Sequence, residues 1–107
     1  MTRGDIVLVR STRGAATKAR PCVVVQRDSA GALPKLTVCP MTSQVDQEND
    51  LRPVVVPSQA NGLIQVSQIE IDWILTEDLR YFGRRIGTVE PTVLAAIDTA
   101  LRRWLDL

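Results

Sequence analysis

ARPCVVV, residues 19–25, is the stretch that decides the fold. Proline holds φ near about −65° and lacks the N–H that a strand interior donates, so we expect Pro21 at the first position of a strand and Arg20 at its mouth. A second apolar strand is predicted over residues 35–41, and Thr42 lies just past its end. If these strands are neighbours, the Arg20 guanidinium and the Thr42 hydroxyl face one patch of solvent, where they are suited to hold a phosphate.

The rest of the chain alternates short apolar segments with turns. Further strands are predicted over residues 4–10, 52–57, 63–75 and 85–89. The apolar run over 4–10 is nearly continuous, which indicates burial on both faces. Pro53 and Pro57 confine their segment to an edge or an end of the sheet. The alternation within 63–75 slips near Ser67 and Gln68, which indicates a β-bulge there.

Turns and a terminal helix complete the pattern. Turns are predicted at residues 28–31 and 61–62, a long polar loop at 42–50, and a helical turn capped by Thr76 at 76–79. A helix that begins near Pro91 carries the apolar stripe Val93, Leu94, Ile97, Leu101, Trp104 and Leu105. These elements predict one domain, residues 1–107, with a mainly β (α+β) fold. Five or six short strands form a strongly bent sheet or barrel, and the helix packs against it.

The composition limits the chemistry that is open to the chain. The sequence has 107 residues, two cysteines and no histidine. Because the usual general base is absent, catalysis must use Arg, Lys, carboxylates or hydroxyls. Cys22 and Cys39 lie in apolar strands and do not form a CxxC pair, so buried free thiols are expected and a metal site is not. We expect no cofactor.

Charge is unevenly distributed along the chain, although the net charge is only +1. Residues 1–27 carry six basic side chains and one acidic one, a local charge of +5, whereas residues 53–79 carry four acidic side chains and no basic one. A basic N-terminal third fits a polyanionic partner, unless folding interleaves the two segments into a neutral surface. No apolar run approaches the about 20 residues that span a membrane, and the N-terminus lacks a secretory pattern, so a cytoplasmic protein is expected.

A set of short motifs follows in a characteristic order along the whole chain. They are Gly4-Asp5-Ile6-Val7, Lys18-Ala19-Arg20-Pro21 with Val23-Val24-Val25, Pro40-Met41-Thr42-Ser43, Gly62-Leu63, Ser67-Gln68-Ile69, Asp72, Thr76 and Arg85-Ile86-Gly87. In this combination the chain resembles the MazF/PemK/Kid toxins of bacterial type II toxin–antitoxin modules. The resemblance implies an SH3-like barrel with a C-terminal helix, which works as a homodimer and is neutralised by a cognate antitoxin protein.

The same resemblance implies an activity and a site. Such toxins are metal-independent endoribonucleases that cut single-stranded RNA, including mRNA, at a short sequence, and their active-site positions fall on Arg20 and Thr42. When the RNA's own 2′-hydroxyl attacks the adjacent phosphate to give a 2′,3′-cyclic phosphate, neither a metal nor a protein nucleophile is needed. Arg20 would then stabilise charge on the phosphorane, and Thr42 would donate to a phosphate oxygen with Ser43 as a helper.

Other residues are candidates for contact with RNA or with a partner. Arg13 and Lys18 flank a glycine-containing loop, where they either grip phosphates or are simply solvated. Gln68 at the expected bulge either reads a base or completes the strand ladder. Trp73 and Trp104 are expected in the core or in a dimer interface. The three arginines at positions 80, 84 and 85 are expected to pair with the acidic stretch before them.

Two alternatives stay open, and the first of them comes from a departure from the family pattern. Many relatives carry an acidic residue in the loop before the arginine, where this chain has Ala16. If that acid is a base in relatives, the role is vacant here or is filled from a second subunit, which would suit a catalytically weak RNA-binding or antitoxin-titrating relative. The other alternative is a CcdB-like toxin that poisons gyrase through a C-terminal tryptophan, to which Trp104 is a distant match. The Arg20-Pro21 and Thr42 positions argue against it.

Overall fold

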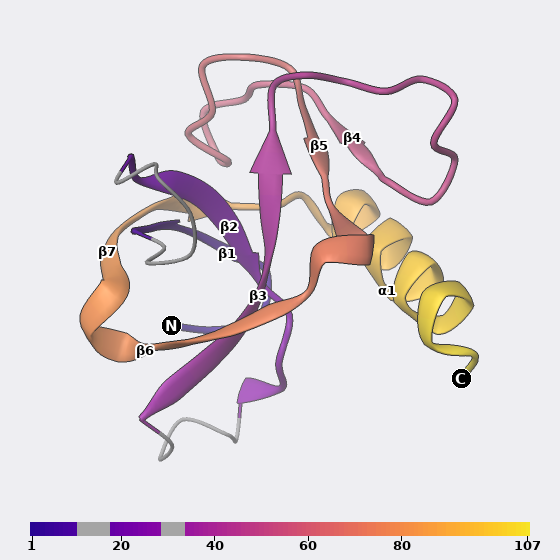
Figure 1. Cartoon of the computed structure of the whole chain (residues 1–107). Helices are drawn as coiled ribbons and strands as arrows, with labels where there is room; N and C mark the ends of the chain where they lie inside the picture. The colour runs from indigo at the N-terminus through magenta and orange to yellow at the C-terminus, as the bar shows by residue number, and fades with distance from the viewer. Residues whose placement is uncertain (11–17, 29–33) are drawn as a thin grey trace.

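A curled antiparallel sheet forms most of the molecule, and a C-terminal helix lies along its side (Figure 1). The structure, a computed structural model, describes residues 1–10, 18–28 and 34–107. Its seven strands are β1 (Asp5–Val9), β2 (Arg20–Val24), β3 (Lys35–Thr42), β4 (Val54–Val55), β5 (Ser67–Ile69), β6 (Leu75–Asp78) and β7 (Phe82–Thr88). The single-turn helices η2 (Ile71–Trp73) and η3 (Leu79–Tyr81) flank β6, and α1 spans Pro91–Leu105. The predicted mainly β fold with a terminal helix is confirmed.

The long strand β3 organises the sheet. One of its edges pairs with β2, with Cys22 opposite Pro40. Its other edge is shared, because residues 35–38 pair with β6 and residues 41–42 pair with β5. Beyond β2 lie β1 and then β7, so the strand order is β4-β5-β3-β2-β1-β7 with β6 beside β3. The end of β3 therefore lies between the beginning of β2 and β5.

The segment between residues 63 and 75 differs from the predicted bulged strand. β5 and β6 lie on the same edge of β3, with Met41 opposite Ile69 and Val38 opposite Leu75. From Val38 to Met41 is a step of three residues along β3, whereas from Ile69 to Leu75 is a step of six along the opposing chain. The three extra residues form the turn η2. The irregularity was correctly expected in this segment, but it is larger than a one-residue bulge and lies further along the chain.

The predicted helical turn at residues 76–79 is also wrong. Thr76 belongs to β6, where its hydroxyl lies 2.8 Å from that of Thr37 on β3. The helical turn follows at η3, and the carboxylate of Asp78 caps it by accepting from the N–H of Arg80 at 3.0 Å. Threonine can cap a helix, but its branched side chain also favours a strand and pairs well with another threonine across the ladder. At Thr76 the pairing with Thr37 outweighs the capping signal. The predicted turn at residues 28–31 falls largely outside the described residues.

Two groups of buried apolar side chains stabilise the sheet and attach the helix. The larger group includes Ile6, Ile69 and Ile97, and it joins the sheet to α1. The smaller group includes Val7 and lies on the opposite face, since adjacent residues of a strand alternate in direction. Burial of β1 on both faces is therefore confirmed. Complete burial of a side chain such as Ile97 contributes about 1.5–3 kcal/mol.

Helix α1 begins with proline at its first position, as predicted, and ends at Asp106 in the left-handed conformation (φ 57°). The apolar stripe is only partly covered. Ile97 and Ala100 are buried, whereas Trp104 and Leu105 near the C-terminus are about half exposed. Trp104 is therefore not a core residue of this chain. Among the described residues, no helix is both long and apolar enough to cross a membrane.

The turn before residue 62 approaches β7 so closely that both sides of the contact require glycine. Gly62 has φ +69°, and a Cβ at this position would lie 2.1 Å from the carbonyl oxygen of Ile86. A Cβ on Gly87 would lie 2.4 Å from the carbonyl carbon of Asn61. Glycine is the one residue that tolerates both the conformation and the distance. This contact fixes the start of the 62–67 segment against the sheet.

Candidate functional site

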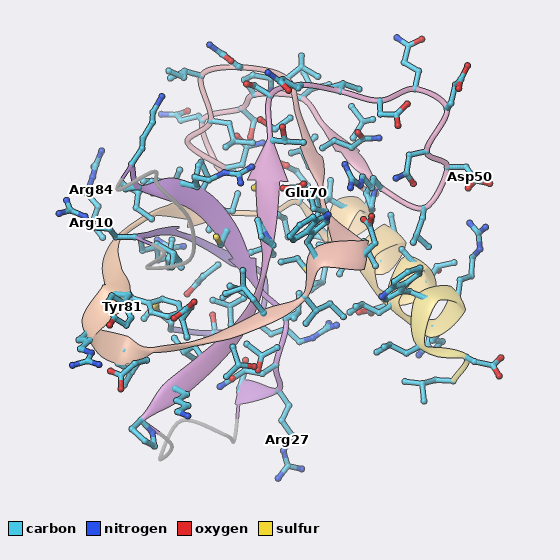
Figure 2. All side chains as sticks on the ribbon, viewed as in Figure 1. Arg10, Arg27, Asp50, Glu70, Tyr81 and Arg84 are labelled. Atoms are coloured by element: carbon cyan, nitrogen blue, oxygen red, sulfur yellow. The ribbon has the colours of Figure 1, made fainter. Side chains whose placement is uncertain are left out.

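A cavity of about 810 Å³ opens at the end of β3, where several strands meet. Its lining comes from residues 18–22, from the end of β3, from residues 62–65, from the η2 region and from β7. Figure 2 shows Glu70 at this place, where β5 passes into η2 beside β3. The cavity therefore lies where the sequence predicts a phosphate site.

Arg20 lies on the cavity wall at the first position of β2. Two residues further along β2, Cys22 pairs with Pro40 of β3, so Arg20 lies beside the end of β3. Its Nη2 atom donates to the carbonyl of Met41 at 3.2 Å and to Oε1 of Glu70 at 3.1 Å. The side chain is 50% exposed. The guanidinium is thus held beside the end of β3 while one side of it remains open to solvent.

Thr42 and Ser43 occupy the end of β3 and the residue after it. Thr42 is half-buried, and its Oγ1 accepts a hydrogen bond from the N–H of Gln44 at 3.1 Å. That contact uses a lone pair, so the hydroxyl hydrogen can still be donated to a ligand. Ser43 is exposed and lines the cavity. The structure therefore places Arg20 and Ser43 on the cavity wall, whereas Thr42, which lies between Met41 and Ser43 in the chain, is outside the described lining.

Glu70 was not singled out from the sequence, yet it lies at the centre of the site. Its N–H donates to the carbonyl of Pro40 at 2.8 Å, and its carbonyl accepts from the N–H of Trp73 at 3.0 Å. The backbone is thus fixed on both sides. The carboxylate contacts Arg20 through Oε1 and lies 3.7 Å from Nη1 of Arg52 through Oε2, with a side chain that is 13% exposed. An acidic residue between Ile69 and Ile71 was the sequence signal that could have identified it.

The neighbouring carboxylate of Asp72 is engaged differently. Arg52 binds it with both prongs of the guanidinium, Nε to Oδ1 at 2.8 Å and Nη2 to Oδ2 at 2.9 Å. Hydrogen bonding to this guanidinium lowers the pKa of Asp72 from its ordinary value of 3.8. Such a bidentate pair is a structural clamp between η2 and the residues before β4. It fixes the position of Arg52, and through Arg52 that of Glu70.

The cavity is electropositive. Its described lining includes three cationic side chains, Lys18, Arg20 and Arg84, and one carboxylate, Glu70, which gives a net charge of +2. The adjacent Arg85 instead faces away and binds Asp5 at 3.0 Å, because neighbours on a strand point to opposite faces. The expectation that the arginines pair with the acidic stretch holds for Arg80, which lies 4.0 Å from Asp78. Arg13, a predicted RNA contact, lies outside the described residues, as does Ala16.

The side chain of Gln68 serves the loop beside the site. It is 1% exposed. Its Oε1 accepts from the N–H of Asp46 at 2.9 Å, and its Nε2 donates to the carbonyls of Asp46, Asn49 and Arg52. These bonds hold the polar loop over residues 46–52 against β5. Gln68 is not among the described residues that line the cavity, and its contact with RNA stays a prediction.

Part of the cavity lining is apolar. Leu63, Ile64, Trp73 and Ile74 belong to this part. Ile64 is 92% exposed and Trp73 is 63% exposed. Trp73 is therefore not a core residue. Its place in a dimer interface stays a prediction.

The two cysteines are buried and unreactive. Both thiols are free and buried, and burial raises the pKa of Cys22 and of Cys39 to about 12. A thiol with such a pKa is inert near neutrality, because the thiolate is the reactive form. The prediction of buried free thiols is confirmed. In the described residues, no three His, Cys, Asp or Glu side chains come together as a metal-binding group.

Comparison with known proteins identifies the family. Residues 2–105 match the family described as PemK-like, MazF-like toxin of type II toxin–antitoxin system. The chain belongs to this toxin family. A PemK/MazF relative from Mycolicibacterium smegmatis, named probable endoribonuclease MazF, is 34% identical over 108 residues that cover 100% of this chain and 98% of the relative.

Solved structures of PemK/MazF toxins share the fold. Mycobacterium tuberculosis toxin MazF-mt6 matches with a TM-score of 0.81 and 27% identity, covering 96% of this chain and 97% of that one. An endoribonuclease from a mycobacterial species, solved in complex with its cognate antitoxin, matches with a TM-score of 0.83 and 20% identity, covering 100% and 96%. The curled sheet with a terminal helix is thus the PemK/MazF fold.

Proposed function

We propose that this toxin-family chain is a sequence-specific endoribonuclease that cleaves single-stranded RNA, including mRNA, without a metal ion. The observation that carries the proposal is the position of Arg20, held by Met41 and Glu70 on the wall of an electropositive cavity beside Thr42. A phosphodiester is the ligand that such a guanidinium binds well. The 34% identity with a probable endoribonuclease supports the same reading.

The chemistry needs no protein nucleophile. The 2′-oxygen of the RNA forms a bond to the adjacent phosphorus while the bond from phosphorus to the 5′-oxygen breaks, which leaves a 2′,3′-cyclic phosphate and a 5′-hydroxyl. Negative charge develops on the non-bridging oxygens of the phosphorane. Arg20 donates charge-assisted hydrogen bonds to one of them, and the hydroxyl of Thr42 donates to another, with Ser43 as a helper. A preorganised donor of this kind contributes about 100- to 1,000-fold to a rate.

Lys18 and Arg84 bind the phosphates that flank the scissile one. Both side chains line the cavity, and neither has a carboxylate partner among the ion pairs between described residues. Their charge favours a polyanion over a neutral ligand, and the gain comes mainly from release of counterions. Base stacking on Trp73, which is 63% exposed at the same cavity, adds to binding of a single strand.

The toxin acts as a homodimer and is neutralised by a cognate antitoxin. Support comes from apolar side chains that are exposed on and beside β4 and on the 62–67 segment, namely Val54, Val56, Ile64 and Val66. Monomeric proteins rarely leave many such side chains uncovered together. Light scattering after size exclusion tests the dimer, and a mass of about 12 kDa, that of one chain, would contradict it. A mycobacterial endoribonuclease of this fold was solved with its antitoxin.

The central test is cleavage of a long natural RNA in the presence of EDTA. The wild-type protein should produce discrete fragments that end in 2′,3′-cyclic phosphate, and Arg20→Ala should not. If the wild type cuts none of a diverse set of RNAs, with or without Mg²⁺, the proposed function is wrong. A parallel supercoiling assay examines the CcdB-like alternative, since accumulation of relaxed DNA at equal protein concentration would favour gyrase as the target.

A further inference from the structure

We infer that Glu70 is the general base of this reaction, the group that removes the proton from the attacking 2′-hydroxyl. The inference rests on the proposed endoribonuclease function and adds a catalytic residue to it. A 2′-hydroxyl is a poor nucleophile until a base takes its proton, and a well-placed base contributes about 100- to 10,000-fold. The protein must supply that base from residues other than histidine, which the chain lacks.

Few groups near Arg20 are able to act as a base. Residues 11–17 read STRGAAT and contain neither a carboxylate nor an imidazole, so the loop before β2 cannot provide one. Within the described lining of the cavity, Glu70 is the single carboxylate. The thiol of Cys22, which also lines the cavity, stays protonated because burial raises its pKa to about 12. Among the carboxylates and thiols of the described lining, Glu70 is therefore the group that can accept the proton.

Glu70 is well placed to receive the proton of a 2′-hydroxyl whose neighbouring phosphate is bound by Arg20. Its Oε1 lies 3.1 Å from Nη2 of Arg20, so a phosphate bound by that guanidinium brings its 2′-hydroxyl within reach of the carboxylate. The backbone hydrogen bonds to Pro40 and Trp73 fix the residue, and its side chain is 13% exposed at the cavity surface. The largely buried position of the side chain limits competing water, and a fixed backbone limits the entropy that must be lost.

Asp72, two residues further on, does not fit the role. Both of its oxygens accept from Arg52, at 2.8 and 2.9 Å, and it is absent from the described lining of the cavity. A carboxylate whose proton affinity is reduced by a bidentate guanidinium is a weaker base. Glu70 contacts the same Arg52 less closely, with 3.7 Å between Oε2 and Nη1. Its Oε1 accepts from the half-exposed Arg20.

An exchange of partners connects binding to catalysis. When the scissile phosphate enters, Arg20 turns its donors from Glu70 to the phosphate oxygens, which leaves Oε1 of Glu70 to accept the proton of the 2′-hydroxyl. The 2′-oxygen then bonds to phosphorus, the 5′-oxygen leaves with the electron pair of its broken bond, and water protonates it. Glu70 afterwards returns its proton to solvent. The charged and titratable groups against this carboxylate are Arg20, Arg52 and Cys22, with Asp72 behind Arg52, whereas Lys18 and Arg84 line the same cavity.

The test is Glu70→Gln, which keeps the shape of the side chain and removes its basicity. Single-turnover cleavage is measured from about pH 3 to pH 8, a range that brackets the ordinary titration of a glutamate carboxyl near about 4.3. Affinity is measured with the same RNA carrying a 2′-O-methyl group at the cleaved position. Glu70→Asp serves as the variant that keeps a carboxylate. Asp106→Asn serves as the control, because it removes one carboxylate at the far C-terminus and asparagine tolerates the same left-handed backbone.

We expect Glu70→Gln to cleave at least about 100-fold more slowly, to lose the rise of rate with pH, and to bind the 2′-O-methyl RNA as tightly as the wild type or more tightly. Glu70→Asp should keep the rise of rate with pH at a reduced maximum. If Glu70 only positions Arg20, Glu70→Gln should bind the methylated RNA more weakly and keep the pH dependence; that result, or an unchanged rate, overturns the inference while leaving the endoribonuclease intact. A wild type that cleaves no RNA overturns both.

Discussion

Replacing Arg20 with alanine should separate catalysis from folding. The structure gives Arg20 two contacts with described residues, to the Met41 carbonyl and to Glu70, and leaves its side chain 50% exposed. An exposed ion pair of this kind is worth about 0–1 kcal/mol. Glu70 is not stranded in the variant, since Arg52 lies 3.7 Å away. The free energy of unfolding should therefore fall by no more than about 1 kcal/mol.

The effect of the same change on cleavage should be much larger. Loss of one preorganised donor to a developing oxyanion costs about 2.7–4 kcal/mol, or about 100- to 1,000-fold in rate. The assay is single-turnover cleavage of a 5′-labelled RNA in EDTA, paired with thermal unfolding of the same preparation. Arg27→Ala is the matched control, because Arg27 is exposed and lies at the other end of the curled sheet from Glu70 (Figure 2).

Two results would refute this reasoning about Arg20. One is a loss of less than about 10-fold with an unchanged unfolding temperature, which would mean that the guanidinium does not touch the transition state. The other is an equal loss in Arg20→Ala and Arg27→Ala, which would mean that overall positive charge matters and position does not. Arg20→Lys should fall between wild type and alanine, since lysine keeps the charge but not the planar fork.

Three further predictions concern binding, pH and thiols. Arg84→Ala should weaken RNA binding and reduce the slope of log affinity against log salt by about 0.7, measured by fluorescence anisotropy at several salt concentrations; an unchanged slope would exclude a phosphate contact. Asp72→Asn should cost about 1–2 kcal/mol in urea unfolding at neutral pH. Because Arg52 lowers the folded-state pKa of Asp72 below 3.8, the gap from wild type should close as the pH falls through that lowered pKa. Cys22 and Cys39, with pKa values raised to about 12, should react with a disulfide reagent at least about 100-fold more slowly in the native protein than in denaturant.

The parts of the site that depend on local rules could be predicted from the sequence. Pro21 must lie at the start of a strand, and this alone places Arg20 at a strand mouth. Thr42 follows a continuous apolar run, and so its place at a strand end was readable. That the two ends meet required only that consecutive strands pair, as they do most of the time. The helix from Pro91 was equally local in origin.

The residues that the sequence did not reveal owe their places to long-range pairing. Glu70 lies in the site because β5 pairs with residues 41–42 of β3, almost thirty positions earlier in the chain. Arg84 lines the cavity and Arg85 binds Asp5, a difference fixed by the register of β7 with β1. Trp73 is 63% exposed because η2 loops out of the sheet. An apolar or aromatic residue in an alternating segment predicts burial, and only the tertiary pairing reveals the exception.

The irregular joint between β5 and β6 explains why the site is where it is. Had the two strands run on without η2, residues 71–73 would have continued the ladder along β3, and their side chains would have alternated between its faces. The looped-out turn instead ends the ladder at Glu70, whose N–H still binds Pro40, and turns Trp73 outward to the rim. The same turn carries Asp72, which clamps Arg52 behind Glu70. This one departure from regular pairing thus places the carboxylate of Glu70 beside Arg20 of β2 and exposes the ring of Trp73. It also places Asp72 where it binds the Arg52 that lies behind Glu70.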